Sequence, residues 1–139
     1  MTHSPRLASL PTWLLSQAAA RSHRVLHEHM VRAGATGYDY RVLAALGDAG
    51  PVSQADLGRS AALDRRDVTH TVRELEARHL VMRQPDPSDA RQTLVELTSA
   101  GKLMLERLDV VIHDVQKEVC RPLTAAQRGA LLDLLRRLT

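Results

Sequence analysis

The sequence predicts a mainly α-helical fold that carries one small β-hairpin (α+β), in a single domain of 139 residues. Apolar residues recur at helical spacing over most of the chain. A turn-forming segment, Pro85–Asp89, separates two β-prone runs at 81–84 and 93–97, and no helix is expected to cross it. Residues that cap helices precede several helical segments. The length suits one domain with its own core, and no repeat or linker indicates a second.

Two helices are expected in the first third of the chain. Thr12 is placed to cap a long first helix, which has Trp13 at its start and ends near Gly34 and Gly37. A second helix is predicted over roughly residues 38–46. Residues 47–51, which contain two glycines and a proline, are expected to break it.

The segment that follows has the spacing of two short helices joined by a turn. Val52 is expected to add a short strand beside the hairpin, and Ser53 caps a short helix that ends at Gly58 or Arg59. Asp64 caps the next helix, where Asp67 at the third helical position completes a weak capping box.

The helix after Asp64 sorts its side chains into three arcs, at roughly 100° per residue. The arc expected to face the core is Val68, Val72, Leu75 and His79. Cations and small hydrogen-bonding groups share the next arc, which consists of Arg65, Arg66, Thr69, His70 and Arg73. Beyond them lie Asp64, Asp67, Glu74 and Arg78. Cations gathered on one face suit a helix that enters a DNA major groove. The alternative is an ordinary amphipathic helix with solvated arginines.

The hairpin and the chain after it extend this interpretation. The hairpin tip is predicted to carry Asp89-Ala90-Arg91, and the Arg91 guanidinium suits a narrow, electronegative minor groove. Asp89 is expected to orient Arg91 through a salt bridge, because a carboxylate facing phosphate is repelled. Thr98 caps a further helix that has Gly101 in its first turn. The closing helices are predicted from Thr98 to about residue 120, and from 124 to the end.

A basic-faced helix followed by an arginine-tipped hairpin indicates a winged helix-turn-helix, with further helices on both sides. Its candidate DNA contacts lie in three places. They are Arg65, Arg66, Thr69, His70 and Arg73 of the reading helix, Ser53 and Gln54 at the start of the preceding helix, and Asp89 and Arg91 of the wing.

The stretch from Tyr38 to Gly101 resembles the MarR family of bacterial regulators, in the segments YDYRVLAAL, VSQADLGRSAALDRRDVTHTVRELEARHLV, D-A-R and LTSAG. With its helical flanks the resemblance covers nearly the whole chain. It implies a homodimeric winged helix-turn-helix repressor that releases DNA on meeting a ligand, metal or oxidant. Residues 1–36 and 102–139 would be the dimerisation helices and 38–101 the DNA-binding region. Two positions depart from the family pattern: Gln92 follows Arg91 where many members carry a second arginine, and His70 stands where a basic residue is frequent.

The composition suits DNA binding through charges localised on one surface rather than through a large net charge. The net charge is only +3, from 19 Lys+Arg and 16 Asp+Glu, so the chain is not a histone-like wrapper. Arginine outnumbers lysine 17 to 2. That bias suits bidentate contacts to guanine and phosphate, but a GC-rich genome explains most of it.

The outer helices predict a homodimer. Apolar residues follow helical spacing at Leu103, Leu108, Val111, Ile112, Val115, Val119, Leu131, Leu134, Leu135 and Leu138. We expect them to exceed what the small winged core can bury, and therefore to pair with a second copy across a two-fold axis. The alternative is that they fold back on their own domain. A two-fold protein suits double-stranded DNA with an inverted-repeat operator.

The effector is less well defined. In relatives the pocket lies where the first, second and fifth helices meet the winged region, and the candidates there are Trp13, His23, His27, Tyr38 and Arg41. This set suits a small aromatic carboxylate or another planar anion. The competing interpretations are a dimer-interface plug for Trp13 and a solvated or salt-bridged Arg41.

Metal and redox sensing are weaker alternatives, and neither a metal site nor a cofactor is predicted. His23 and His27 are one helical turn apart, and His29 or His113 could approach them, but a zinc site needs more ligands than this pattern offers. The single cysteine, Cys120, lies late in the chain, whereas the peroxide-sensing branch of the family carries its reactive cysteine near the first helix. A structural thiol is the simpler interpretation.

Other classes fit less well. The sequence has no nucleophile elbow, phosphate-binding glycine loop or H-E-x-x-H motif, and Ser22 and His23 are neighbours whose side chains diverge on a helix. An architectural DNA-binding protein would explain the winged helix but not the long flanking helices. The absence of an export signal or membrane-spanning run predicts a cytoplasmic protein with no membrane partner and a reduced Cys120.

Overall fold

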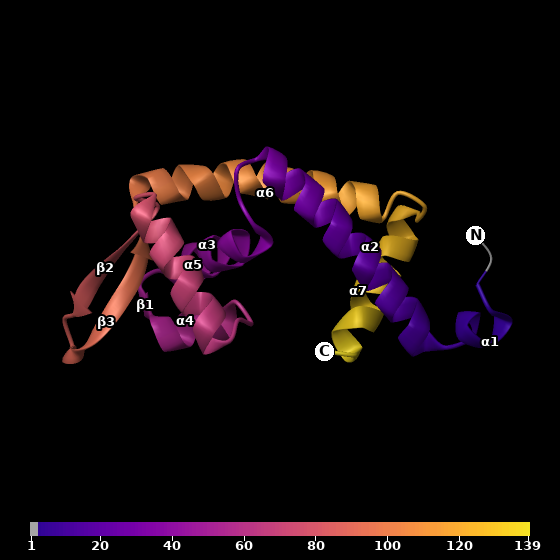
Figure 1. The fold of residues 1–139 in the computed structure, drawn as a ribbon, viewed down its shortest axis with the longest axis horizontal. Helices are drawn as coiled ribbons and strands as arrows, with labels where there is room; N and C mark the ends of the chain where they lie inside the picture. The colour runs from indigo at the N-terminus through magenta and orange to yellow at the C-terminus, as the bar shows by residue number, and fades with distance from the viewer. Residues whose placement is uncertain (1–2) are drawn as a thin grey trace. The chain divides into compact units, whose positions relative to one another are not determined.

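The computed structural model describes residues 3–139 (Figure 1). Its elements, in chain order, are α1 (Pro5–Ala8), α2 (Pro11–Arg32), α3 (Gly37–Ala49), β1 (Val52–Ser53), α4 (Gln54–Ser60), α5 (Arg65–Ala77), β2 (Val81–Asp86), β3 (Asp89–Leu97), α6 (Ser99–Val119) and α7 (Ala125–Arg137). The predicted class, mainly helical with a small hairpin, is confirmed.

The chain divides into two compact units. One joins the N-terminal segment up to His29 with Ile112–Thr139, and the other is Met30–Val111. The divisions fall inside α2 and α6, so the first half of α6 belongs with the hairpin and α3–α5. We call Met30–Val111 the winged unit and the remainder the terminal unit.

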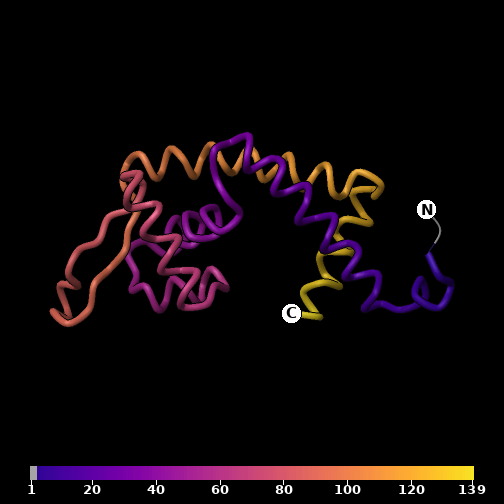
Figure 2. The backbone as a smooth tube through the Cα atoms, viewed as in Figure 1, coloured from indigo at the N-terminus to yellow at the C-terminus, as the bar shows by residue number. Residues whose placement is uncertain are grey.

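The winged unit packs α3, α4 and α5 against a small antiparallel sheet. The strand order is β1-β3-β2, with Val52 opposite Val95 and Val81 opposite Leu97. The backbone trace shows the three helices on one side of the hairpin, whose tip points away from them (Figure 2). Nine side chains of the core are almost completely buried: Met30, Val42, Leu43, Leu46, Leu57, Val72, Leu75, Val95 and Leu108. Their burial fixes the three helices relative to the sheet.

Side-chain caps begin the helices of this unit. Ser53 Oγ accepts from the Asp56 amide, Asp64 Oδ1 from the Asp67 amide, and Thr98 Oγ1 from the Gly101 amide. These three caps are confirmed, although Asp64 makes only half of the predicted capping box. The full capping box of the unit joins Thr36 and Asp39 at the start of α3.

The predicted end of α3 is too early. The helix begins at Gly37, within one residue of the prediction, and continues through Gly47 to Ala49, because an isolated glycine costs a helix only about 1 kcal/mol. The helix is terminated by its C-cap residue Gly50, whose backbone φ of +74° is rarely adopted by residues other than glycine.

The hairpin is longer than predicted. Pairing continues through Pro85, which lies opposite Thr93, and the turn is reduced to Pro87 and Ser88. Proline lacks only a donor, so it remains compatible with β2, an edge strand. Asp89 therefore begins β3 instead of lying in the turn.

The core face of α5 also differs from the prediction at two residues. Val68, Val72 and Leu75 are buried as expected, but Thr71 is only 3% exposed and joins them. His79 is not on this face, because α5 ends at Ala77 and His79 is an exposed residue with a φ of +60°.

In the terminal unit, α2 begins at Pro11 and not after Thr12, and a short helix, α1, precedes it. Proline at the first helical position leaves no donor unpaired, which explains the earlier start. Arg21 on α2 donates to the carbonyls of Val119 (2.8 Å) and Glu118 (3.2 Å) at the end of α6. His29 lies 2.6 Å from a Glu118 carboxylate oxygen, and this hydrogen bond lowers the pKa of Glu118.

The apolar residues of the outer helices divide into two groups. Leu108 and Val115 are buried within the chain, contrary to the expectation that its own core could not bury them. Large apolar side chains remain exposed on α2, α6 and α7, among them Leu14 (52%), Leu103 (67%), Leu134 (58%) and Leu138 (68%). In residues 3–139 no helix combines the length and the apolar composition needed to cross a membrane.

Candidate nucleic-acid interface

The five predicted reading residues of α5 lie together. Arg65, Arg66, Thr69, His70 and Arg73 line one groove of ≈ 490 Å³. Arg65, Arg66, His70 and Arg73 are exposed, while the opposite face of the helix is buried. Three guanidinium groups on one open face, with no carboxylate among them, form a surface for a polyanion.

Thr69 lies between the arginines, and its hydroxyl is engaged. Thr69 Oγ1 donates to the Arg65 carbonyl (2.6 Å) and accepts from Gln54 Nε2 at the start of α4 (2.8 Å). The hydrogen bond between Gln54 and Thr69 connects α4 and α5, the two helices of the helix-turn-helix. The Gln54 Oε1 atom is buried without a hydrogen-bond partner.

The two residues at the start of α4 that were predicted as DNA contacts are less accessible than those of α5. Ser53 is only 7% exposed, and its hydroxyl is occupied in capping α4. Gln54 is half-buried, with its amide directed at Thr69. Both therefore hold other groups in place.

The wing presents Arg91 almost without contacts. Its side chain is 96% exposed, and its Nε lies 3.9 Å from Asp89 Oδ1, a long and solvated ion pair. The firmer contact of Asp89 is with the backbone, because it accepts from the Arg91 amide at 3.0 Å. In the turn, Asp86 accepts from the amide and the hydroxyl of Ser88, and the amide hydrogen bond is the main cause of its lowered pKa. These carboxylates shape the backbone of the wing.

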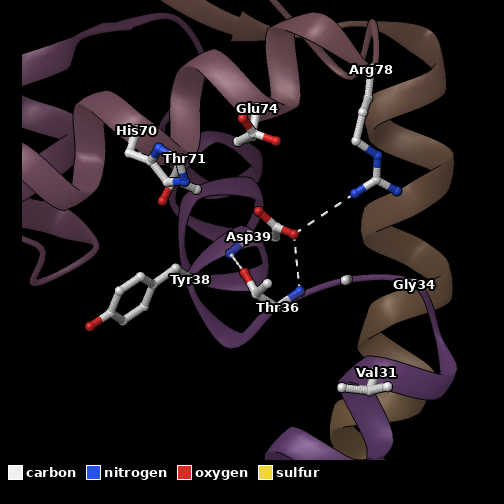
Figure 3. A pocket seen from close by; sticks show the side chains of 10 residues that line it. Val31, Gly34, Thr36, Tyr38, Asp39, His70, Thr71, Glu74 and Arg78 are labelled. Carbon is white, nitrogen blue, oxygen red and sulfur yellow. Dashed lines mark hydrogen bonds and ion pairs between the residues drawn. The ribbon is translucent and has the colours of Figure 1, made fainter.

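A second hollow of ≈ 520 Å³ lies between α5 and the start of α3. Asp39, which is 7% exposed, accepts from the Thr36 amide (3.0 Å), and the same oxygen lies 3.8 Å from Arg78 Nη1 (Figure 3). Tyr38, His70, Thr71 and Glu74 also line the hollow. His70 therefore borders both this hollow and the basic groove.

The predicted effector residues are only partly brought together. Arg41 donates to the carbonyls of Ala61 and Ala62, and its guanidinium carbon is 5.5 Å from the Tyr38 ring centroid. Arg41 does not line the hollow that Tyr38 borders. The other three candidates belong to the terminal unit, where Trp13 packs edge-on against His3 (5.8 Å between centroids) and His23 and His27 are exposed. Over residues 3–139, no three His, Cys, Asp or Glu side chains are grouped so as to hold a metal ion.

The fold and the basic groove define a class of protein, a winged helix-turn-helix DNA-binding protein. Comparison with known proteins narrows this class. The model of the MarR family matches residues 36–93. The HTH-type transcriptional repressor NicR of Pseudomonas putida is 34% identical over 125 residues, which are 90% of this chain and 79% of NicR.

Solved structures agree. A probable transcriptional regulator from Pseudomonas aeruginosa superposes with a TM-score of 0.87 at 32% identity, over 96% of this chain and 99% of that one. Bordetella bronchiseptica BpsR, whose DNA binding is regulated by 6-hydroxynicotinic acid, superposes with a TM-score of 0.82 at 30% identity, over 90% and 95% of the two chains. The chain belongs to the MarR family and is a DNA-binding transcriptional regulator.

Proposed function

We propose that this protein is a ligand-responsive repressor that binds an inverted-repeat operator as a homodimer and acts without catalysis. The observation that carries the proposal is the groove on α5, where three exposed arginines surround Thr69 on a helix whose opposite face is buried. In this arrangement α5 enters the major groove and Arg91 of the wing enters the adjacent minor groove. The protein would act in the cytoplasm, where bacterial operators lie.

The exposed apolar residues support dimerisation. Leucines of the terminal unit remain exposed on α2 and α7, as do Leu103 and Val110 on α6. Isolated exposed leucines are ordinary, but several on helices at both ends of a DNA-binding chain suit a two-fold interface. The dimer would use residues 1–36 and 102–139. Its two α5 helices would lie about 34–36 Å apart and read half-sites about 10 base pairs apart.

The effector proposed is a small planar acid, because 6-hydroxynicotinic acid regulates DNA binding by BpsR. The hollow beside α5 offers one physical route from ligand to DNA. Its wall includes His70, Thr71 and Glu74 of the reading helix, so that an occupant would contact the helix directly. Trp13, His23, His27, Tyr38 and Arg41 remain the residues proposed from the sequence.

Footprinting on the DNA upstream of the protein's own gene tests the operator. We expect one protected inverted repeat, bound selectively over random duplex at physiological salt. Addition of 6-hydroxynicotinic acid is then expected to release that DNA in a fluorescence-anisotropy titration. Equal affinity for every duplex would contradict the proposal and indicate an architectural protein. If ultracentrifugation shows a monomer at micromolar concentration, the proposed homodimer is contradicted.

Replacement of one arginine tests the reading helix. Arg66→Ala is expected to weaken operator binding by about 1–3 kcal/mol and to relax selectivity at one base-pair position. Arg83→Ala is the control, because Arg83 of β2 pairs with Glu76 (Nε to Oε2, 3.4 Å) and does not line the groove, so this variant should bind as the unmodified protein does. If both variants retain the original affinity and selectivity, α5 is not the reading helix.

A further inference from the structure

The hydroxyl of Thr69 is not free to donate to a base. A threonine hydroxyl carries one hydrogen, and Thr69 uses it on the Arg65 carbonyl at 2.6 Å. One lone pair of the same oxygen accepts from Gln54 Nε2 at 2.8 Å. The acceptors on the major-groove edges of guanine, adenine and thymine all require a donor. Thr69 therefore has no proton to offer them, although it lies in the middle of the basic groove.

The two hydrogen bonds also select a rotamer. In a helix, threonine divides between two χ1 rotamers because its hydroxyl can bond to a preceding carbonyl. In the rotamer observed, the oxygen is held between the helix backbone and Gln54 of α4. With its hydroxyl hydrogen and one lone pair engaged, the side chain of Thr69 has its methyl group and one lone pair left for contacts in the groove.

Gln54 keeps this arrangement at a cost. Its Oε1 atom is buried without a partner, and a buried amide oxygen with no hydrogen bond destabilises a fold. An apolar side chain of the same length would avoid this cost. The one hydrogen bond that the Gln54 side chain makes is the one to Thr69.

We propose that Thr69 reads DNA through its methyl group, by contact with the 5-methyl group of a thymine, and that Gln54 is the positioning residue that holds it there. This inference rests on the proposed function, in which α5 enters the major groove. A methyl–methyl contact is the apolar readout that distinguishes thymine from the other bases.

Substitution in the DNA tests the contact without changing the protein. Each thymine of the footprinted operator is replaced in turn by deoxyuridine, which lacks only the methyl group. We expect one position in each half-site to lose affinity by about fourfold, the equivalent of about 0.8 kcal/mol for one buried methyl. If no position responds, the inference is overturned while the repressor proposal stands. If no selective operator is found, the proposed function has failed instead.

Two variants separate the methyl group from the hydroxyl. The thymine-to-uracil ratio is the affinity for the unmodified operator divided by the affinity for the operator with deoxyuridine at the responding position. Thr69→Ser keeps the hydroxyl and loses the methyl, so this ratio should fall from about fourfold to near one. Thr69→Val keeps a methyl and loses the hydroxyl, so the ratio should persist even if overall affinity falls. Thr124→Ser, the same change at the cap of α7, is the control and should keep the full ratio. A ratio that survives in Thr69→Ser but disappears in Thr69→Val would show that the hydroxyl reads the base.

Gln54→Met tests the positioning role. Methionine approximates the length of glutamine and has no amide, so the buried orphan oxygen disappears. We expect the thymine-to-uracil ratio to approach one while the melting temperature is unchanged or higher. A fourfold ratio retained in Gln54→Met would refute the positioning role of Gln54, whatever happens to the melting temperature.

Discussion

Among the glycines Gly34, Gly47, Gly50, Gly58, Gly101 and Gly129, an added Cβ would come closest to the backbone of another segment at Gly101. It lies in the first turn of α6, buried beside Leu80 at the start of the hairpin. A Cβ atom there would lie 1.9 Å from the Leu80 carbonyl oxygen and 3.0 Å from its carbonyl carbon. Leu80 cannot turn away, because its carbonyl accepts from the Thr98 amide at 3.1 Å and its amide donates to Leu75 at 2.9 Å.

Gly101→Ala is therefore expected to force α6 away from the hairpin base by about 1 Å. Overpacking against fixed backbone belongs at the upper end of its usual cost, about 3 kcal/mol. An unfolding entropy of about 2.1 cal/mol/K per residue gives roughly 0.3 kcal/mol/K for this chain, so the melting temperature should fall by about 10 °C. Thermal unfolding followed by circular dichroism, at one protein concentration, measures the change.

Gly129→Ala is the matched control. Gly129 is in the middle of α7, and a Cβ atom there meets nothing within 4 Å. Alanine favours a helix over glycine by roughly 0.5–1 kcal/mol, so this variant should melt slightly higher. If Gly101→Ala has the same melting temperature as the unmodified protein, the close approach of α6 to Leu80 is wrong.

Three further predictions concern the wing, α3 and α5. Arg91→Ala should weaken binding to operator and to non-specific DNA alike. The slope of log affinity against log salt concentration should become shallower by about one, while the melting temperature stays unchanged. An unchanged salt dependence would place the wing away from DNA. Burial, and then the hydrogen bond to Asp109, raises the pKa of Tyr40 to about 12. The folded state thus favours the protonated phenol, and this stability is complete below pH 10 and lost toward pH 12. Urea unfolding should show that loss in the unmodified protein and in Tyr38→Phe, but a smaller one in Tyr40→Phe; equal losses in all three would exclude Tyr40. Asp64→Ala should cost about 1 kcal/mol in the same assay, because it removes the cap on the Asp67 amide, and an unchanged unfolding midpoint would show that this cap is dispensable.

Local features of the chain were sufficient to predict three helix caps and the residues that line the basic groove. Ser53, Asp64 and Thr98 cap helices because a short polar side chain reaches the amide three residues ahead, which depends on sequence spacing alone. The clustering of cations on one face of α5 likewise follows from helical geometry, and the structure places all five of these residues in one groove.

Two of the wrong predictions depend on how separate segments pair or pack. The hairpin extends through Pro85 because Thr93 lies opposite it, and no local turn signal encodes that pairing. Thr71 lies three residues after Val68 and four before Leu75, so helical spacing puts it on the core face, but its polar side chain gave no reason to expect burial.

The sequence by itself determined which residues share the basic face of α5, because a helix of known phase sorts its side chains by spacing. Only the tertiary structure decided how Thr69 is used. Its hydroxyl is engaged by Gln54, 15 residues earlier on another helix. The close approach at Gly101 arises in the same way, from a carbonyl 21 positions away. Both depend on how separate elements pack, and packing is set by the whole core rather than by any local run of residues.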